Sequence, residues 1–290
     1  MLQHTLARLR PLMPQAVRRA NEALDIALAG VRGSRWPEVA WCASGLTNTG
    51  YPVEWSWSSR DPSLRWTADT SAPETPERER LERALATLHA LGGAAELPDW
   101  LWPRPGRELR FGAWLGGRHD ERRDRYKLYV DAGGAPVPAS ESIPRRTTWR
   151  MAGLDGDVVE LYGRIEGLEV WEAERMLAGI DIRPLMNIAA RLAGAPHDDR
   201  LLPGTAGITV ALRKGAVAAA GVFVQAGPLL GGDAAIARKI HELCAQFHWD
   251  ATIYDALLGS DAPPVPGRHG MLGFGTDAEG RPWLQIGLRP

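Results

Sequence analysis

The sequence is poor in cysteine and has no excess of either charge. Its 290 residues include two cysteines, Cys42 and Cys244, which are too few for a disulfide framework and favour a reducing compartment. Lysine and arginine number 34 against 35 aspartate and glutamate residues, which gives a formal net charge of −1. Such a balance creates no global field that would attract nucleic acid or an anionic membrane, so we expect neither as a partner.

Long hydrophobic runs are also missing. Residues 1–30 have the pattern of an amphipathic helix with arginine on one side, without the apolar core and cleavage site of a signal peptide. The most apolar stretch, residues 215–232, is largely alanine and glycine and is interrupted by Gln225 and Pro228. The sequence therefore predicts a soluble, cytoplasmic protein.

Motifs that hold phosphate through a glycine-rich loop or through metal ions are absent as well. The segment GFGTDAEG matches a dinucleotide fingerprint only superficially, because it lies in a predicted hairpin rather than before a helix. Asp198 and Asp199 form no aspartate-rich motif and fall in a predicted loop. His241, Cys244 and His248 share one helical face, a pattern that is more often a buried stripe than a zinc site. The sequence therefore predicts no metal site.

What the sequence does contain is a repeated order of hairpins and helices. Five pairs of strand-like segments flank short turns, of which Asp155-Gly156 is a strong hairpin-turn dipeptide. Helical segments separate most of these pairs, at residues 76–93, 171–192 and 233–249. The order repeats with a period of roughly fifty residues. Ten antiparallel strands predict a closed barrel, because closure removes exposed strand edges.

The expected fold class is therefore α+β, with a ten-stranded antiparallel β-barrel of five hairpins surrounded by α-helices. We expect one domain over residues 1–290, in which residues 1–30 form a helix that packs outside the barrel. A barrel of about eight strands is nearly filled by side chains, whereas sixteen strands leave a channel. Ten strands should leave a solvent-filled lumen of small-molecule size.

Polar and aliphatic residues alternate along the predicted strands. The aliphatic face suits packing against helices, so the face with charged, phenolic and indole groups should line the lumen. The alternative is an open antiparallel sheet whose polar face lies in water. Four aromatic residues on the polar face favour the lined cavity over this alternative: Tyr129, Tyr162, Trp283 and Trp114.

The predicted lumen combines cations, phenols, an amide and carboxylates: Arg65, Lys127, Arg213, Tyr129, Tyr162, Gln285, Glu54 and Glu160. Cations and phenol hydroxyls that converge in an enclosed site are what a phosphate or diphosphate group needs. Without a metal motif, side chains would hold the anion. The acidic groups, which include Asp69 and Asp131, would suit a cationic second substrate.

The strand motifs GYPVEWSWSS, LRWTADTS, RYKLYV and VELYGR resemble those of the ABBA-type (PT-barrel) prenyltransferases. The resemblance extends roughly from Trp36 to the C-terminus and looks closest to the bacterial peptide prenyltransferases of cyanobactin-like pathways. It implies a ten-stranded antiparallel barrel with helices outside and the active site in the lumen. It also implies transfer of an isoprenyl group from its diphosphate to an acceptor.

The resemblance assigns roles by position. Glu54 resembles the glutamate that orients the acceptor and removes its proton, and Arg65 resembles the first diphosphate-binding arginine. Lys127 and Tyr129 match the Lys-x-Tyr pair that grips the diphosphate, and Tyr162 matches the tyrosine of the next such pair.

One position departs from the family. Glu160 stands where many relatives have a lysine, which either alters diphosphate binding or makes Glu160 part of the acceptor pocket. Arg213 and Gln285 are candidates for the remaining diphosphate contacts. The aromatic candidates for shielding an allylic cation or closing the prenyl pocket are Trp114, Trp283 and Phe223.

The sequence thus predicts a monomeric prenyltransferase that moves a dimethylallyl or geranyl group to a side chain of a macrocyclic ribosomal peptide. One alternative is prenylation of a free indole or phenol. Another is a barrel that only binds a lipophilic ligand, although charges in a closed lumen argue against it. No cofactor is required by any motif, and Mg²⁺ would be compatible with the diphosphate.

Overall fold

The computed structural model describes residues 2–103, 108–137, 142–177, 180–194, 199–259 and 267–290. Ten strands carry the architecture: β1 Val53–Ser58, β2 Leu64–Ala68, β3 Ala113–His119, β4 Asp124–Asp131, β5 Thr148–Asp155, β6 Val158–Glu166, β7 Thr205–Arg213, β8 Ala216–Gln225, β9 His269–Asp277 and β10 Pro282–Leu288. Each strand pairs antiparallel with its sequence neighbours, and β1 pairs with β10. The predicted closed barrel of five hairpins is confirmed.

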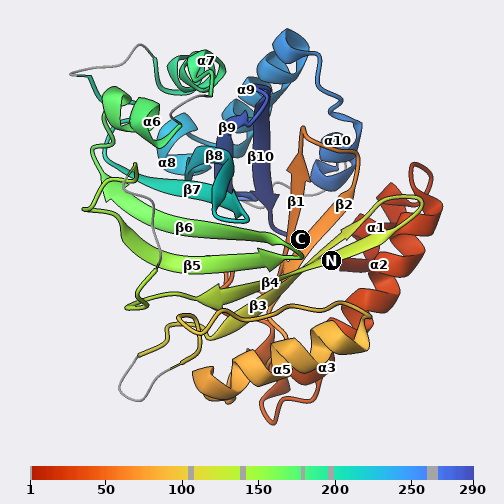
Figure 1. Cartoon of the computed structure of the whole chain (residues 1–290). Coiled ribbons are helices and arrows are strands. Elements are labelled where there is room, and N and C mark those ends of the chain that lie inside the picture. The colour runs from red at the N-terminus through yellow and green to blue at the C-terminus, as the bar shows by residue number, and fades with distance from the viewer. Residues whose placement is uncertain (1, 104–107, 138–141, 178–179, 195–198, 260–266) are drawn as a thin grey trace.

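Helices surround this barrel (Figure 1). Their bounds are α1 Leu2–Leu9, α2 Pro14–Ala27, α3 Ala29–Arg32, α4 Pro37–Ala40, α5 Glu77–Ala90, α6 Val170–Met176, α7 Arg183–Ala193, α8 Ala226–Leu230, α9 Asp233–Phe247 and α10 Thr252–Leu258. Helices α2 and α5 pack on β3, α10 packs on β1, and α7 and α8 pack on β9. None of the helices in the described ranges is long and apolar enough to cross a membrane.

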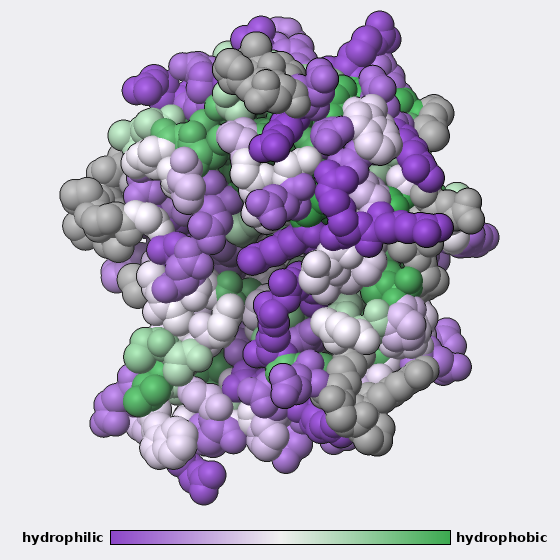
Figure 2. Space-filling model, turned by 90° about the vertical axis from the view of Figure 1, so that its left-hand side faces the viewer, coloured by the Kyte–Doolittle hydropathy of each residue, from purple (hydrophilic) through white to green (hydrophobic). Residues whose placement is uncertain are grey.

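The hydrophobic core lies between the barrel wall and the helices. Outward-facing residues of the strands, such as Trp55, Trp66 and Phe274, are at most 1% exposed. Burying side chains of this size supplies a large share of the driving force for folding. The tryptophan-rich composition is thus explained in part by the outer face of the barrel. Figure 2 shows that hydrophilic side chains cover most of one side of the molecule, with hydrophobic groups only in scattered spots.

The hairpin turns follow the sequence pattern closely. Lys214 and Gly215 both adopt positive φ, 50° and 81°, as the tight turn between β7 and β8 requires. Gly156 has φ 60° in the turn between β5 and β6. Short turns join β1 to β2, β3 to β4, β5 to β6, β7 to β8 and β9 to β10, and all neighbouring strands are antiparallel, so these five turns lie at one end of the barrel. We call it the hairpin end.

Two helical predictions need correction. Residues 1–30 do not form one helix: α1 ends at Leu9, and α2 starts at Pro14 and packs outside the barrel as expected. Proline lacks an N–H and clashes with the preceding turn, so Pro11 and Pro14 divide the segment. Residues 171–192 likewise divide into α6 and α7, with Pro184 in the first turn of α7. The short helix α4 follows Trp36 and precedes β1.

Candidate active site

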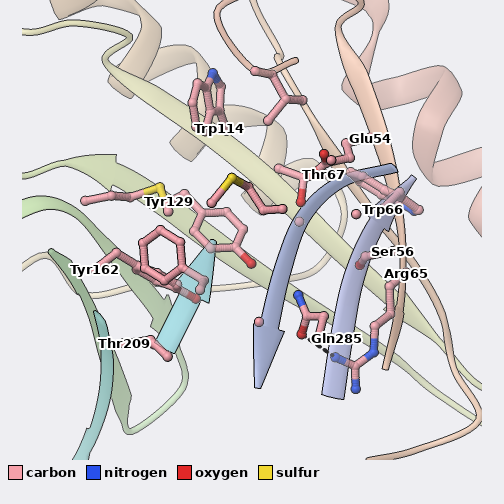
Figure 3. A pocket seen from close by; sticks show the side chains of 18 of the residues that line it. Glu54, Ser56, Arg65, Trp66, Thr67, Trp114, Tyr129, Tyr162, Thr209 and Gln285 are labelled. Carbon is pink, nitrogen blue, oxygen red and sulfur yellow. Dashed lines mark hydrogen bonds between the residues drawn. The ribbon is translucent and has the colours of Figure 1, made fainter. Parts of the chain in front are cut away.

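A cavity of about 400 Å³ occupies the lumen, and every strand contributes to its wall (Figure 3). The strand residues that line it include Glu54, Ser56, Arg65, Thr67, Trp114, Arg118, Lys127, Tyr129, Met151, Glu160, Tyr162, Thr209, Phe223, Met271, Trp283 and Gln285. A polar face that encloses a cavity is incompatible with the open sheet considered as an alternative. The volume is in the range of ordinary small-molecule sites.

Glycines make room for the large side chains in the lumen. A Cβ at Gly207 would lie 2.2 Å from the ring of Phe223, which pairs with it across β7 and β8. A Cβ at Gly153 would lie 2.6 Å from the Cε of Lys127. A glycine opposite a bulky neighbour therefore lets that neighbour lie flat against the barrel wall.

Glu54 lies near the end of the lumen opposite the hairpin turns. Gly270 and Gly287 flank it so closely that a Cβ on either would lie 2.7 or 2.6 Å from its Oε1. Among the described residues, none donates a hydrogen bond to its carboxylate. Burial raises the pKa of Glu54 to about 7, and the positive charge of Arg289 limits the rise. A carboxylate with this pKa is suited to accept a proton at neutral pH.

Lys127, Glu160 and Tyr162 form a tight cluster in the wall. The Nζ of Lys127 donates to Glu160 Oε2 and lies 3.3 Å from the Tyr162 hydroxyl, which also donates to Glu160 Oε2. The same ammonium lies 5.2 Å from the ring centroid of Tyr129 and 5.8 Å from that of Tyr162. Burial, followed by the charge of Glu160, raises the pKa of Tyr162 well above its usual value, so the phenol keeps its proton.

Arginines on three adjacent strands form a row near the hairpin end. Arg65 pairs with Arg118 across β2 and β3, and Arg118 pairs with Arg125 across β3 and β4. Asp61 accepts hydrogen bonds from Arg65 at 2.7 Å and from Arg125 at 3.4 Å. Arg65 also donates to Gln285 Oε1 at 3.4 Å (Figure 3). Directly paired strand residues point to the same face, so the row concentrates positive charge in one part of the site.

Arg60 adds a further cation from the β1–β2 turn. Its guanidinium lies 4.2 Å from the ring centroid of Trp283, which is a cation–π contact. Trp283 is only 7% exposed, and Arg60 covers one of its faces. Trp114, the second residue of β3, stacks on Phe111 with 3.9 Å between ring centroids. Of the two tryptophans assigned to cation shielding, Trp114 is therefore not covered by a cationic side chain in the described part of the chain.

The structure brings together ten of the eleven site residues proposed from the sequence, all of which line the cavity: Glu54, Arg65, Lys127, Tyr129, Tyr162, Gln285, Glu160, Trp114, Phe223 and Trp283. Arg213 is the exception. Its side chain is 60% exposed at the end of β7 and lies 3.4 Å from Asp157, outside the cavity wall. A solvated ion pair at a strand end offers little to an enclosed diphosphate.

The expected excess of acid in the lumen is wrong. Asp69 pairs with Arg80 of α5 at 2.9 Å, and Asp131 accepts a hydrogen bond from the N–H of Gly133 at 2.8 Å. Neither residue lines the cavity. With Glu160 already paired to Lys127, Glu54 is the carboxylate that remains for an acceptor among the described residues that line the cavity.

The sequence reasoning missed Arg60, Asp61 and Arg118. Arg60 and Asp61 lie between β1 and β2, and Arg118 is the last but one residue of β3. The strand pairing would have revealed Arg118. Strand β3 extends to His119, and its register with β2 places Arg118 directly opposite Arg65. Within the described ranges, no group of three or more His, Cys, Asp or Glu side chains could hold a metal ion.

Comparison with known proteins identifies the fold. No family model matches the sequence, and no curated protein matches it significantly. The solved structures that match include 5-dimethylallyltryptophan synthase from Streptomyces coelicolor, 6-dimethylallyltryptophan synthase from Micromonospora olivasterospora, and AnaPT from Neosartorya fischeri. Their TM-scores are 0.79, 0.76 and 0.66, at 16%, 18% and 14% sequence identity.

These matches extend over nearly all of each chain. They cover 99%, 99% and 98% of this chain, and 95%, 95% and 91% of the other chains, in the order given. Matches of this extent and TM-score show a shared overall fold. The chain has the ABBA-type, or PT-barrel, fold of these prenyltransferases.

Proposed function

We propose that the protein transfers a dimethylallyl or geranyl group from its diphosphate to an aromatic acceptor. The observation that carries this proposal is the division of one closed lumen into two chemically distinct ends. Arg60, Arg65 and Arg118 lie toward the hairpin end, Lys127 and Tyr162 lie near the middle of their strands, and Glu54, whose pKa is about 7, lies toward the other end. A leaving anion and a proton that must be removed need these two kinds of group.

At the cationic end, Arg65, Lys127 and Gln285 would bind the diphosphate, together with the hydroxyls of Tyr129 and Tyr162. The bond between the allylic carbon and the diphosphate oxygen breaks, the electron pair stays with the oxygen, and an allylic cation remains. Positive and hydrogen-bonding groups stabilise the charge that develops on the leaving oxygen. Lys127 is 2% exposed, so its charge acts where little water screens it.

The aromatic wall would shield the allylic cation from water. Tyr162 stands 6.1 Å from Phe223 in an edge-to-face arrangement, and Tyr129 stands 6.1 Å from Tyr162. Each aromatic face can stabilise a nearby cation by about 0.5–2 kcal/mol. We assign Trp114 to the same wall. Trp283 has a lesser part in this role because Arg60 already covers its ring.

At the other end, Glu54 would accept the proton that the acceptor loses as the new bond to carbon forms. Because the other acidic groups are paired, a neutral indole or phenol suits this site better than a cationic side chain. The neighbouring structures agree with this assignment: the S. coelicolor enzyme was solved in complex with DMASPP and Trp. A macrocyclic ribosomal peptide that presents such a ring is the second acceptor class that we propose.

The charges in the lumen separate this proposal from a barrel that merely stores a lipophilic ligand. A site for a lipid alone should be mostly apolar, since buried charges without a use are costly. Here Arg65, Arg118 and Lys127 line a cavity together with Glu160. A ligand that combines an anionic head with a hydrocarbon chain uses both the charged and the aromatic parts.

The test is mass spectrometry of the purified protein with dimethylallyl or geranyl diphosphate and a panel of acceptors. The panel contains free tryptophan, tyrosine and indole, and cyclic peptides with and without these side chains. Reactions run with Mg²⁺ and with EDTA, because Mg²⁺ can bind the diphosphate itself. We expect a product heavier by one isoprenyl unit, lost in Glu54→Gln and Arg65→Ala.

Arg213→Ala is the matched control, because it removes an arginine of the same barrel that lies outside the cavity. It should retain full activity. If calorimetry detects no binding of either diphosphate, the prenyltransferase proposal fails. If the donor binds and only peptides react, a free indole or phenol is not the acceptor, but the proposed prenyl transfer is retained.

A further inference from the structure

Glu160 places a carboxylate in the part of the lumen where an anion should bind. Its Oε2 accepts hydrogen bonds from Lys127 and Tyr162, two of the groups assigned to the diphosphate. Burial opposes ionisation, but the positive charges of Lys127 and then Arg118 lower the pKa of Glu160 to about 2. The carboxylate is therefore ionised at neutral pH and carries the same sign of charge as the diphosphate.

Lys127 does not need Glu160 to hold its position. Its aliphatic stem lies against Gly153, where even one added carbon would come within 2.6 Å of the Cε. The rings of Tyr129 and Tyr162 both lie within cation–π range of the ammonium, with 6.1 Å between their centroids. These contacts fix the direction of the Lys127 side chain without a carboxylate. Positioning of Lys127 therefore does not explain why residue 160 carries a charge.

Other cations near Glu160 would remain in the site of a variant that lacks this carboxylate. Arg118 and Arg60 both lie close enough for its charge to act on them. Arg118 retains Asp155 at 3.6 Å as a second partner. Without Glu160 the site would hold one more uncompensated positive charge, and an anion would bind there more tightly.

We propose, on the basis of the prenyl-transfer function above, that Glu160 is an internal competitor of the diphosphate. In the empty site it holds Lys127 and Tyr162. When the donor binds, the diphosphate oxygens take over these two donors, and Glu160 returns to them as inorganic diphosphate leaves. The carboxylate thus weakens binding of the product and speeds its release.

The proposal predicts a substitution that tightens binding. Glu160→Gln keeps the shape and a hydrogen-bond acceptor but removes the charge, so inorganic diphosphate should bind on the order of tenfold more tightly. If Glu160 only positioned Lys127, the same variant would bind diphosphate more weakly. Glu160→Met, which has similar volume and needs no hydrogen-bond partner, keeps the test valid if the glutamine variant folds poorly.

The experiment is isothermal titration calorimetry with inorganic diphosphate on wild type, Glu160→Gln, Lys127→Met and the double variant. Glu166→Gln is the matched control, because Glu166 lies on the same strand but is exposed. The gain from Glu160→Gln should shrink when Lys127 is absent, since the competition is for that ammonium. Multiple-turnover kinetics should show a burst in Glu160→Gln, because product release becomes slow relative to transfer.

The outcomes separate the two proposals. Tighter binding in Glu160→Gln with no change in Glu166→Gln supports the competitor. Weaker or equal binding in folded Glu160→Gln and Glu160→Met overturns it and leaves the prenyl-transfer proposal standing. Absence of diphosphate binding in wild type and in every variant overturns both.

Discussion

At the scale of single residues, Glu54 joins two opposing properties. Its raised pKa makes it a usable base, and the same burial makes its charge costly to the fold. The folded chain keeps a proton on Glu54 that the unfolded chain loses between pH 4.5 and about 7. The contribution of this group to the free energy of unfolding therefore falls as the pH rises through that window.

We expect Glu54→Gln to lose transfer while it gains on the order of 3 kcal/mol of stability at pH 8. Its stability advantage should disappear at pH 4, where the wild-type carboxyl is neutral in both states. Urea denaturation of both proteins at the two pH values measures this. Equal stabilities at pH 8 would contradict the burial of a charged Glu54.

The acid limb of the activity profile should follow the same group. Transfer needs Glu54 ionised, so the rate with saturating donor should rise with pH to a midpoint near 7. Arg289 holds the pKa of Glu54 down, so Arg289→Met should move the midpoint to higher pH. The matched control is Arg281→Met, whose guanidinium pairs with Asp277 and Glu279 on the surface. A midpoint that stays in place would show that another group limits the rate.

Phe223 is the residue that we expect to limit donor length. Its ring lies against Gly207 on one side and meets Tyr162 on the other, so it occupies space in the prenyl wall. Phe223→Ala should open that space and raise kcat/KM for geranyl relative to dimethylallyl diphosphate by about tenfold. Competition between the two donors, followed by mass spectrometry, measures the ratio. An unchanged ratio would place the end of the prenyl chain elsewhere.

At the scale of elements, a hydrogen-bonded relay holds α2 to the barrel. Trp66 Nε1 donates to His119 Nε2 at 2.9 Å, His119 Nδ1 lies 2.8 Å from Asp124, and Arg19 of α2 pairs with Asp124 at 2.9 Å. Burial lowers the pKa of His119 below its usual 6.5, so the ring is neutral in the folded state. Below about pH 6.5 the unfolded chain binds a proton at His119 and the folded chain does not. The contribution of His119 to the free energy of unfolding therefore falls as the pH drops below this value.

Between pH 6.5 and 5, we expect His119→Gln to lose about 1 kcal/mol less unfolding free energy than the protein with His119. The comparison belongs in a Glu54→Gln background, because Glu54 has the opposite pH dependence in the same range. His269, whose pKa burial also lowers, contributes with the same sign, so His269→Gln serves as the parallel measurement. Thermal melts across the range would show the slopes. Identical slopes with and without His119 would contradict the relay.

The elements also show how far the sequence could predict the structure. Strand alternation predicted the lumen face, because a period of two survives whatever packs outside the strand. Helix continuity was overestimated at residues 1–30 and 171–192, since amphipathic spacing persisted across prolines that divide the segments. Arg118 was missed for a different reason: its place in the lumen depends on pairing with β2, which lies about fifty residues earlier in the chain.

The sequence predicted which types of side chain line the site, but not which of the charged groups form ion pairs with one another. Lys127 and Glu54 were found from strand motifs, but whether an acid faces a ligand or a partner depends on tertiary contacts. Asp69 shares the lumen face of its strand by alternation, yet Arg80 of α5 draws it into a buried ion pair. Nothing in the local sequence around Asp69 shows that partner.

At the scale of the whole molecule, the barrel depends on a contact between the two most distant strands. Pairing of β1 with β10 closes the wall, so the lumen exists only after the chain has brought residues more than two hundred positions apart together. Such non-local pairing is slow to form and cooperative once formed. Strand β10 also buries Leu284, Ile286 and Leu288 against the outer core.

We therefore expect removal of residues 282–290 to abolish cooperative folding. The truncated chain loses the ladders of β10 with β1 and β9, and it leaves two unpaired strand edges beside an open lumen. It should bind a hydrophobic dye and show no sharp thermal transition, whereas a chain without residues 1–9, which pack outside the barrel on α10 and α2, should still melt cooperatively. A peptide of residues 282–290 added to the truncated chain should restore diphosphate binding if closure is what creates the site. A truncated chain that melts at the wild-type temperature would show that nine strands and the helices suffice, and that the lumen does not depend on closure.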